Sequence, residues 1–314
     1  MTAQLVTLGE AMAVLATPGI GLLRQSRSLD LRVAGAEANV AIGAARLGVP
    51  SAWIGRLGDD EFGALVRQTL AGQQVDVSGV RTDPAAPTGL MVKERRTSTV
   101  TRVTYRRAGS AGSRLSAADL DHDVLDNAEI LHVTGITPAL SASAREAVHA
   151  AVEGAREAGV LVSVDVNHRE RLWSGAEAAA EYRWLAERAD ILFVTEAEAR
   201  LLVDGDDAPA LASALTALGT HEVLVKRGGD GAIAMIEGEL VDVPLFEVAT
   251  LDPVGAGDAF ASGYLVERIR GAEPAQRVRT AAAAGAFAVT VDGDWEGLPT
   301  YAELDLLTSA DVHR

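Results

Sequence analysis

A glycine-rich segment near the C-terminus, DPVGAGDAF, holds the residues best suited to chemistry: Gly255, Gly257 and Asp258. It leads from an extended stretch into an amphipathic helical pattern. The first backbone N–H groups of a helix lack partners and carry the positive end of its dipole, so glycines there let an anion approach. This geometry suits phosphoryl transfer, with Asp258 as the base for an attacking hydroxyl. Taken alone, the same pattern also fits an ordinary capped helix.

The elements that must position this segment follow a βαβ rhythm, in which short apolar runs alternate with Ala-rich helical patterns. Strands are expected at 5–9, 51–55, 129–133, 160–166, 190–194 and 222–226, and helices near 37–48, 59–72, 142–158, 176–188 and 208–218. Residues 281–289 fit a tightly packed helix. The sequence therefore predicts a single α/β domain over residues 1–314, with a mostly parallel sheet flanked by helices.

Two stretches, 11–34 and 88–107, break this rhythm because β-branched and polar residues alternate in them. That period is typical of strands. They are expected to form antiparallel strands outside the main sheet, as a small β lid inserted in the domain. A surface hairpin without function would look the same, since arginine-rich strand faces are often simply solvated.

Composition narrows the possible ligands and the location. The formal net charge of −16 argues against nucleic acid as a partner, and an anionic substrate would need a local cluster of arginines. The chain has no cysteine, no basic and apolar leader at its N-terminus and no apolar run of the roughly 18 residues that a membrane span needs. We therefore expect a soluble, cytoplasmic protein with no membrane partner.

These segments together resemble the ribokinase-like, or PfkB, family of carbohydrate kinases. DPVGAGDAFASGY is similar to that family's C-terminal signature, and Gly35, Glu37 and Asn39 in AGAEANVAIGAARLG match its N-terminal motif. IGRLGDDEFG, at 54–63, also lies where the family has it. A Rossmann dehydrogenase is disfavoured because LVTLGEAMAV carries no GxGxxG fingerprint. The resemblance implies a ribokinase-like fold with a central sheet and a small lid.

The resemblance also implies roles for individual residues. Gly255, Ala256 and Gly257 would form the anion hole and Asp258 would be the catalytic base. ATP would be bound by Asn167, Thr195, Lys226, Gly228, Gly229 and Gly231, together with Gly255 and Gly257. Mg²⁺ would be organised by Glu198 through water, and Asp252 would help to bind a monovalent cation. A plain hairpin turn at 228–231 and a helix cap at 195–198 remain open alternatives.

Two further segments, VTYRRAGSAGS and SVDVNHRERLW, resemble the 2-keto-3-deoxygluconate kinases within this family. By that resemblance Arg107 and Arg169 would bind the substrate carboxylate and Tyr105 would form a wall. Gly35, Asn39 and Asp258 would complete the sugar site. Adjacent residues of a strand point to opposite faces, so only one of Arg106 and Arg107 can face it. A structural salt bridge is the alternative for Arg169.

The expected reaction is ATP-dependent phosphorylation of the 6-hydroxyl of 2-dehydro-3-deoxy-D-gluconate, a small acidic sugar, to its 6-phosphate. One alternative is a kinase of fructose, a nucleoside or another ketose. An alternative of another class is a sugar-binding regulatory protein that has lost catalysis. His168 is expected to pack or to contact the nucleotide rather than to catalyse. Exposed lid strands also favour a homo-oligomer that pairs through the lid.

Overall fold

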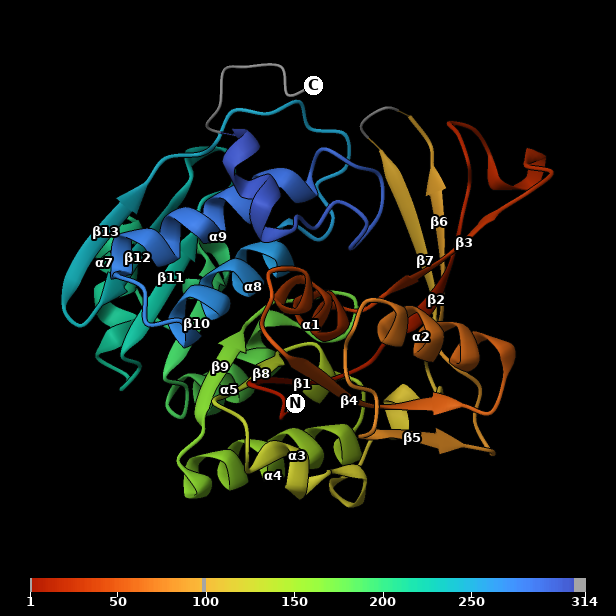
Figure 1. Cartoon of the computed structure of the whole chain (residues 1–314), viewed down its shortest axis with the longest axis horizontal. Coiled ribbons are helices and arrows are strands. Elements are labelled where there is room, and N and C mark those ends of the chain that lie inside the picture. The colour runs from red at the N-terminus through yellow and green to blue at the C-terminus, as the bar shows by residue number, and fades with distance from the viewer. Residues whose placement is uncertain (1, 98–99, 308–314) are drawn as a thin grey trace.

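The computed structural model describes residues 2–97 and 100–307, which form a large twisted sheet, a small sheet and covering helices (Figure 1). In these residues the large sheet has the strand order β13-β12-β11-β10-β9-β8-β1-β4-β5. Its strands are β1 (Leu5–Leu8), β4 (Ser51–Gly58), β5 (Val80–Asp83), β8 (Ile130–Thr134), β9 (Leu161–Asp165), β10 (Ile191–Thr195), β11 (Glu222–Lys226), β12 (Ala232–Ile236) and β13 (Glu239–Val243). All neighbours are parallel except β11–β12 and β12–β13, which are antiparallel.

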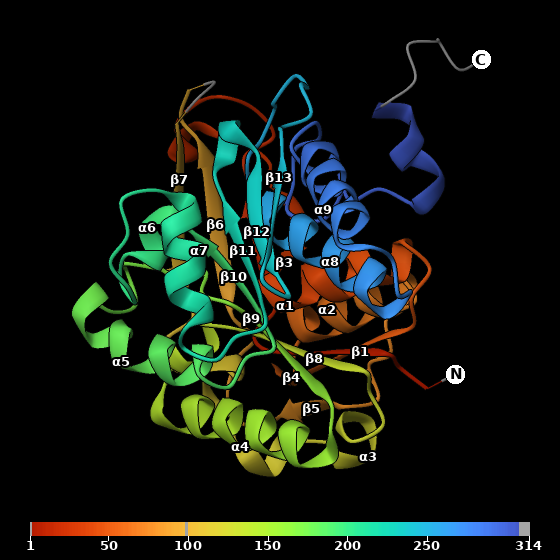
Figure 2. The ribbon, with the colours of Figure 1, turned by 90° about the vertical axis from the view of Figure 1, so that its left-hand side faces the viewer.

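Helices cover both faces of this sheet, which therefore buries apolar side chains on both sides (Figure 2). The helices are α1 (Ala36–Arg46), α2 (Glu61–Gly72), α3 (His122–Leu125), α4 (Ala142–Ala158), α5 (Gly175–Ala186), α6 (Glu196–Ala199), α7 (Ala208–Thr216), α8 (Ala256–Ile269) and α9 (Pro274–Ala288). Val6 packs in the core that includes α4, α5 and α7, whereas its neighbour Leu5 packs in the core that includes α1, α8 and α9. No helix in the described part of the chain is long and apolar enough to cross a membrane.

The predicted fold class is confirmed. Each expected strand and helix forms, with boundaries shifted by a few residues, and residues 281–288 form the second half of α9. Strands β5 and β13 were not predicted. Both lie at an edge of the sheet, where a strand does not need the continuous apolar run that marks the central strands. The sequence of β5 is VRTD, and no residue of β13 is fully buried.

The lid is a four-stranded sheet with the order β3-β2-β6-β7 that stands beside the main sheet (Figure 1). It consists of β2 (Met12–Ala16), β3 (Asp30–Ala34), β6 (Leu90–Arg95) and β7 (Thr101–Arg106), all within the two predicted stretches. Residues 98–99 of the second stretch lie outside the described residues. The expectation of antiparallel strands is wrong for one pair, because β2 and β6 are parallel. Each enters the lid from the main body, so the two run in the same direction.

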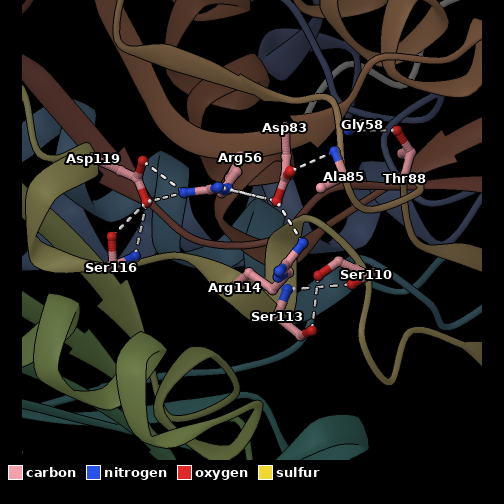
Figure 3. Close-up of polar contacts among 10 residues, drawn as sticks. All are labelled: Arg56, Gly58, Asp83, Ala85, Thr88, Ser110, Ser113, Arg114, Ser116 and Asp119. Carbon is pink, nitrogen blue, oxygen red and sulfur yellow. Dashed lines mark hydrogen bonds and ion pairs between the residues drawn. The ribbon is translucent and has the colours of Figure 1, made fainter.

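A network of two buried aspartates and two partly exposed arginines fastens the base of the lid to the main sheet (Figure 3). Arg56 of β4 lies between Asp83, at the end of β5, and Asp119, with nitrogen to oxygen distances of 3.0 and 3.1 Å. Arg114 also contacts Asp83 at 3.3 Å. Because Asp83 precedes β6 and Arg114 follows β7, this network joins both ends of that hairpin to the sheet. It also gives the 54–63 motif a structural role.

Candidate active site

The carboxyl ends of the parallel strands meet under the lid in a pocket of about 770 Å³. Open parallel sheets bind ligands at this edge, and the volume suits a nucleotide with a small substrate. The candidate residues from both ends of the chain line it together: Gly35, Asn39, Tyr105, Arg107, Asn167, Arg169, Thr195, Glu198, Lys226, Gly228, Gly229, Gly231, Gly255, Ala256, Gly257 and Asp258. Asp252 is not part of this lining.

The anion hole predicted at the start of α8 requires glycine at Gly255, whereas Gly257 lies in ordinary contact with a lysine. Gly255 is the N-cap residue and has a left-handed backbone, with φ +79°. A Cβ atom there would lie 2.0 Å from the carbonyl oxygen of Asp294, so only glycine fits. At Gly257 a Cβ atom would lie 3.5 Å from the ammonium nitrogen of Lys226. The first N–H groups of α8, which lack intrahelical partners, therefore lie at the pocket lining beside a positive charge.

Asp258 lies in the first turn of α8, half-buried at the floor of the pocket. The Asn39 amide donates a hydrogen bond of 2.7 Å to its Oδ2 atom. Burial raises the pKa of Asp258 to about 7; the Asn39 hydrogen bond opposes this shift, the charge of Asp165 adds to it, and the charges of Arg169 and Lys226 oppose it. A carboxylate with this pKa can accept and release a proton near neutral pH.

Lys226, at the end of β11, is held by Asp165 at the end of β9. Its Nζ atom donates to both carboxylate oxygens of Asp165, at 2.9 and 2.7 Å. Burial alone would lower the pKa of Lys226, but the charges of Asp165 and Glu198 outweigh burial and raise it. The ammonium group therefore stays charged beside Gly257. Asp165 was not predicted as a site residue, although its place at the end of an apolar strand indicates that it lies at the ligand-binding edge of the sheet.

The segment 228–231 forms a hairpin turn that also reaches the pocket. It is the turn of the antiparallel β11–β12 hairpin, and Gly228, Gly229 and Gly231 line the pocket. Gly231 has φ +81°, and a Cβ atom there would lie 2.2 Å from the carbonyl oxygen of Val243. Sequence reasoning missed an apolar wall beside this turn, made by Leu245, Phe246, Val248 and Val289, because these residues belong to no recognisable motif.

Thr195 and Glu198 form the helix cap that the sequence left open as the alternative to an ATP and Mg²⁺ site; it caps α6. The Thr195 hydroxyl accepts from the backbone N–H of Glu198, and Glu198 Oε2 accepts from the backbone N–H of Thr195, at 3.3 and 2.7 Å. The other oxygen of Glu198 accepts from the backbone N–H of His168 at 2.7 Å. This cap fixes the Glu198 carboxylate at the pocket wall without using all of its acceptor capacity.

Arg107 reaches the pocket, whereas Arg106 is exposed on the other face of the strand. The Arg107 guanidinium lies 5.4 Å from the centre of the Tyr105 ring and donates to Glu10 Oε2 at 2.7 Å. Glu10 is 3% exposed and also accepts from Ser110. Glu10 was not predicted as a site residue, and it neutralises much of the charge that Arg107 was expected to offer a ligand.

Arg169 differs from Arg107 because it has no carboxylate partner in the described part of the chain. Its only hydrogen bond there is to the neighbouring carbonyl of His168, at 3.3 Å. The structural salt bridge considered for Arg169 is therefore not observed. His168 itself packs, as expected, with its Nδ1 atom 2.8 Å from the Tyr182 hydroxyl. Asn167 turns the chain here with φ +41°.

Gly35 allows the close approach that its motif requires. A Cβ atom at this N-cap of α1 would lie 2.6 Å from the carbonyl oxygen of Glu10. Two residues later, the buried Glu37 carboxylate accepts from the hydroxyls of Thr134 and Thr137, each at 2.7 Å. The start of α1 is thus joined to the strand ends, and this contact places Asn39 opposite Asp258.

Comparison with known proteins agrees with this geometry. Residues 2–301 match the pfkB family of carbohydrate kinases. A 2-dehydro-3-deoxygalactonokinase from Haloferax volcanii is 37% identical over 296 residues, 94% of this chain and 93% of that protein. A 2-dehydro-3-deoxygluconokinase from Thermoproteus tenax is 36% identical over 310 residues, 98% of this chain and 94% of that protein.

The solved structures give the same result for the fold. A putative ribokinase II from E. coli, in complex with ATP and Mg²⁺, superposes with a TM-score of 0.90 at 27% identity, covering 98% of this chain and 99% of that chain. The fold is ribokinase-like, as expected. By fold, by matched length and by identity to its relatives, the chain belongs to the pfkB family of carbohydrate kinases.

Proposed function

We propose that this carbohydrate kinase transfers the γ-phosphoryl group of ATP to the 6-hydroxyl of 2-dehydro-3-deoxy-D-gluconate. The observation that carries the proposal is Arg169, a guanidinium at the pocket with no carboxylate partner in the described part of the chain. In a chain with a formal net charge of −16, such a group suits an acidic substrate. The names of the two relatives, both kinases of acidic deoxy sugars, support the same class.

In the proposed reaction Asp258 accepts the proton of the 6-hydroxyl as that oxygen attacks the γ-phosphorus. One P–O bond forms to the sugar, the bond to the β-phosphate oxygen breaks, and ADP leaves. The N–H groups of the 255–257 turn would donate to the transferring oxygens, and Lys226 would add positive charge beside them. Asn39 keeps the Asp258 carboxylate aimed at the pocket.

Mg²⁺ would neutralise the β- and γ-phosphate oxygens. In the described residues no group of three or more His, Cys, Asp or Glu side chains is placed to hold a metal ion. The residues therefore fit an ion carried by the phosphates, with Glu198 contributing through water because its carboxylate keeps free acceptor capacity. Asp165 is not available as a ligand of the ion, since both its carboxylate oxygens accept from Lys226.

The test is an ADP-release assay over a panel of acceptors: 2-dehydro-3-deoxygluconate, its galactonate epimer, fructose, ribose and a nucleoside. Arg169→Met should raise KM for the two acids by about 10- to 100-fold, because a charge-assisted hydrogen bond contributes about 1.5–3 kcal/mol. KM for ATP should stay unchanged. Arg106→Met, which removes an exposed arginine outside the pocket, is the matched control.

The outcomes separate the candidates. Faster turnover of a neutral ketose than of either acid would contradict the acidic substrate and favour the fructose or nucleoside alternative. Faster turnover of the galactonate epimer would reassign the substrate to the one named in the Haloferax volcanii relative. Sugar binding without any ADP release would indicate the regulatory protein.

A further inference from the structure

A lysine from the lid is inserted beside the start of α8. Lys93, on β6, is 8% exposed, and its Nζ atom donates to Asp252 Oδ2 at 2.6 Å. The same nitrogen lies 3.7 Å from Asp294 Oδ1. A buried ammonium group is tolerated only when it is paired, and here two carboxylates share it. Removing it would leave two acidic side chains facing each other in a confined space.

These two acids belong to the loops that shape the predicted anion hole. Asp252 directly precedes the Pro-Val-Gly turn, and its Oδ1 atom accepts from the backbone N–H of Val254 at 3.2 Å. Asp294 lies on the other side, where its carbonyl oxygen would be 2.0 Å from a Cβ atom at Gly255. The Lys93 ammonium group therefore bridges the two loops that enclose the Gly255 peptide.

The charges of the three groups are consistent with this bridge. Burial alone would raise the pKa of Asp252, but the hydrogen bond and the charge of Lys93 lower it. Burial raises the pKa of Asp294 to about 6, and Lys93 opposes that shift. Asp252 thus stays ionised because the lid supplies its counter-charge.

The expected monovalent cation site at Asp252 does not fit this arrangement. Both carboxylate oxygens already accept from groups of the chain itself, Oδ2 from Lys93 and Oδ1 from Val254. The position beside Asp252 that would attract a free cation is occupied by the ammonium group of Lys93. This is a disagreement between the family resemblance and the side chains of this chain.

We propose that Lys93 is a positioning residue: a cation on the lid that holds Asp252 and Asp294 together, fixes the Gly255 peptide and replaces a free monovalent cation. The inference rests on the proposed role of residues 255–257 in phosphoryl transfer. It also links the position of the lid to the chemistry, because the ion pair joins β6 to the loop that precedes Gly255.

Another lid contact supplies the matched control. Arg32 of β3 pairs with Asp292 at 3.0 Å and donates to the Asp292 carbonyl oxygen at 3.0 Å. The Arg32 side chain is 23% exposed, against 9% for Lys93. It joins the lid to the same loop without touching Asp252 or Asp294. Arg32→Met therefore removes a lid-to-loop ion pair while leaving the proposed bridge intact.

The experiment measures steady-state kinetics and thermal midpoints in choline, sodium, potassium and ammonium chloride. The wild-type kcat should vary by less than about twofold among these salts. Lys93→Met should lower kcat by about 10- to 100-fold, with KM for ATP and sugar changed by less than about threefold, because a displaced loop misplaces the reacting groups. Arg32→Met should stay within about twofold of wild type. Lys93→Met with Asp252→Asn, which removes both charges, should recover part of the loss.

Lys93→Ala provides a readout that does not need turnover. Ammonium or methylammonium should raise its thermal midpoint above the value in choline, because a ligand that binds only the folded state stabilises it. The wild-type midpoint should show no such difference. The same salts should restore part of the kcat of Lys93→Ala.

Any of three kinetic results would overturn the inference: potassium activation of the wild type, a Lys93→Met kcat within about twofold of wild type, or an equal loss in Arg32→Met. A Lys93→Ala protein indifferent to ammonium in both readouts would also overturn it. If the wild type releases no ADP with any acceptor, the proposed function fails instead, and the ammonium-dependent midpoint still decides whether Lys93 occupies a cation site.

Discussion

Replacing the Asp258 carboxylate by an amide should separate catalysis from stability. In Asp258→Asn the side chain keeps its shape, and the Asn39 amide can still donate to the new carbonyl oxygen at the position of Oδ2. Both substrates should therefore bind with nearly unchanged KM. Loss of a general base costs about 10²- to 10⁴-fold in rate, so kcat should fall by that factor.

The same change should stabilise the protein at alkaline pH. Burial raises the Asp258 pKa from 3.8 to about 7, so the folded state binds this proton more tightly than the unfolded chain does. The contribution of Asp258 to the free energy of unfolding therefore falls as pH rises from about 4 to about 7. The ionised carboxylate destabilises the folded state most above pH 7. At about 1.4 kcal/mol per pKa unit the upper limit is about 4 kcal/mol.

The destabilisation by the ionised carboxylate that an experiment would measure is smaller than this limit, because Asp258 is half-buried and faces the water of the pocket. Solvent screening reduces it to about 1–2 kcal/mol, or about 2–5 °C in Tm. Asp258→Asn should therefore melt above the wild type at pH 8, with the difference shrinking below pH 7 and vanishing near pH 4. Calorimetry over this pH range measures it.

The wild-type pH–rate profile gives an independent reading. Because the base must be deprotonated, kcat/KM should fall as pH drops through about 7. A variant that kept kcat within tenfold of wild type would refute the assignment of Asp258 as base. A variant that melted lower than wild type at pH 8 would refute the burial argument, whatever its activity.

Three other predictions concern the surrounding structure. Gly255→Ala should lower kcat about 100-fold and stability by about 1–3 kcal/mol, because φ is +79° and the new Cβ would meet Asp294; urea unfolding and steady-state kinetics measure both. Arg56→Met should lower the free energy of unfolding by about 1–2 kcal/mol, since the buried Asp83 carboxylate loses one partner but keeps Arg114 and the Ala85 N–H; an unchanged urea midpoint would contradict this. We also propose that the lid pairs with that of a second chain, since Leu31 on β3 is 50% exposed; light scattering should give a dimer that Leu31→Lys dissociates, and a monomeric wild type would exclude it.

Local patterns in the sequence were sufficient for the fold class, and the family resemblance named many of the polar residues that gather in the pocket. Strands such as Ile191–Thr195 are continuous apolar runs because both faces of a parallel sheet are covered, and this pattern is visible without coordinates. Gly255 and Gly231 are constrained by their own backbone angles, so their residue types also carry the signal. Both signals depend only on residues that are close together in the sequence.

The partners of the charged residues depend on the tertiary structure alone. Glu10 meets Arg107 and Lys93 meets Asp252 across 97 and 159 positions of the chain. No periodicity links such pairs, because the strand order and the lid docking decide which side chains share a cavity. The pKa of Asp258 likewise depends on the folded chain: burial raises it, Asp165 adds to the shift, and Asn39, Arg169 and Lys226, which come from different elements, oppose it.

The sequence by itself therefore determined the α/β fold with a lid and the carbohydrate kinase family, and it predicted an anion-binding helix start and arginines for an acidic sugar. The tertiary structure alone decided how the cations are paired: within the described residues Arg169 has no carboxylate partner, Arg107 pairs with Glu10, and Lys93 is held between Asp252 and Asp294. The physical reason is that backbone preferences are set by neighbouring residues, whereas burial and charge pairing are set by contacts between distant segments that exist only in the folded chain.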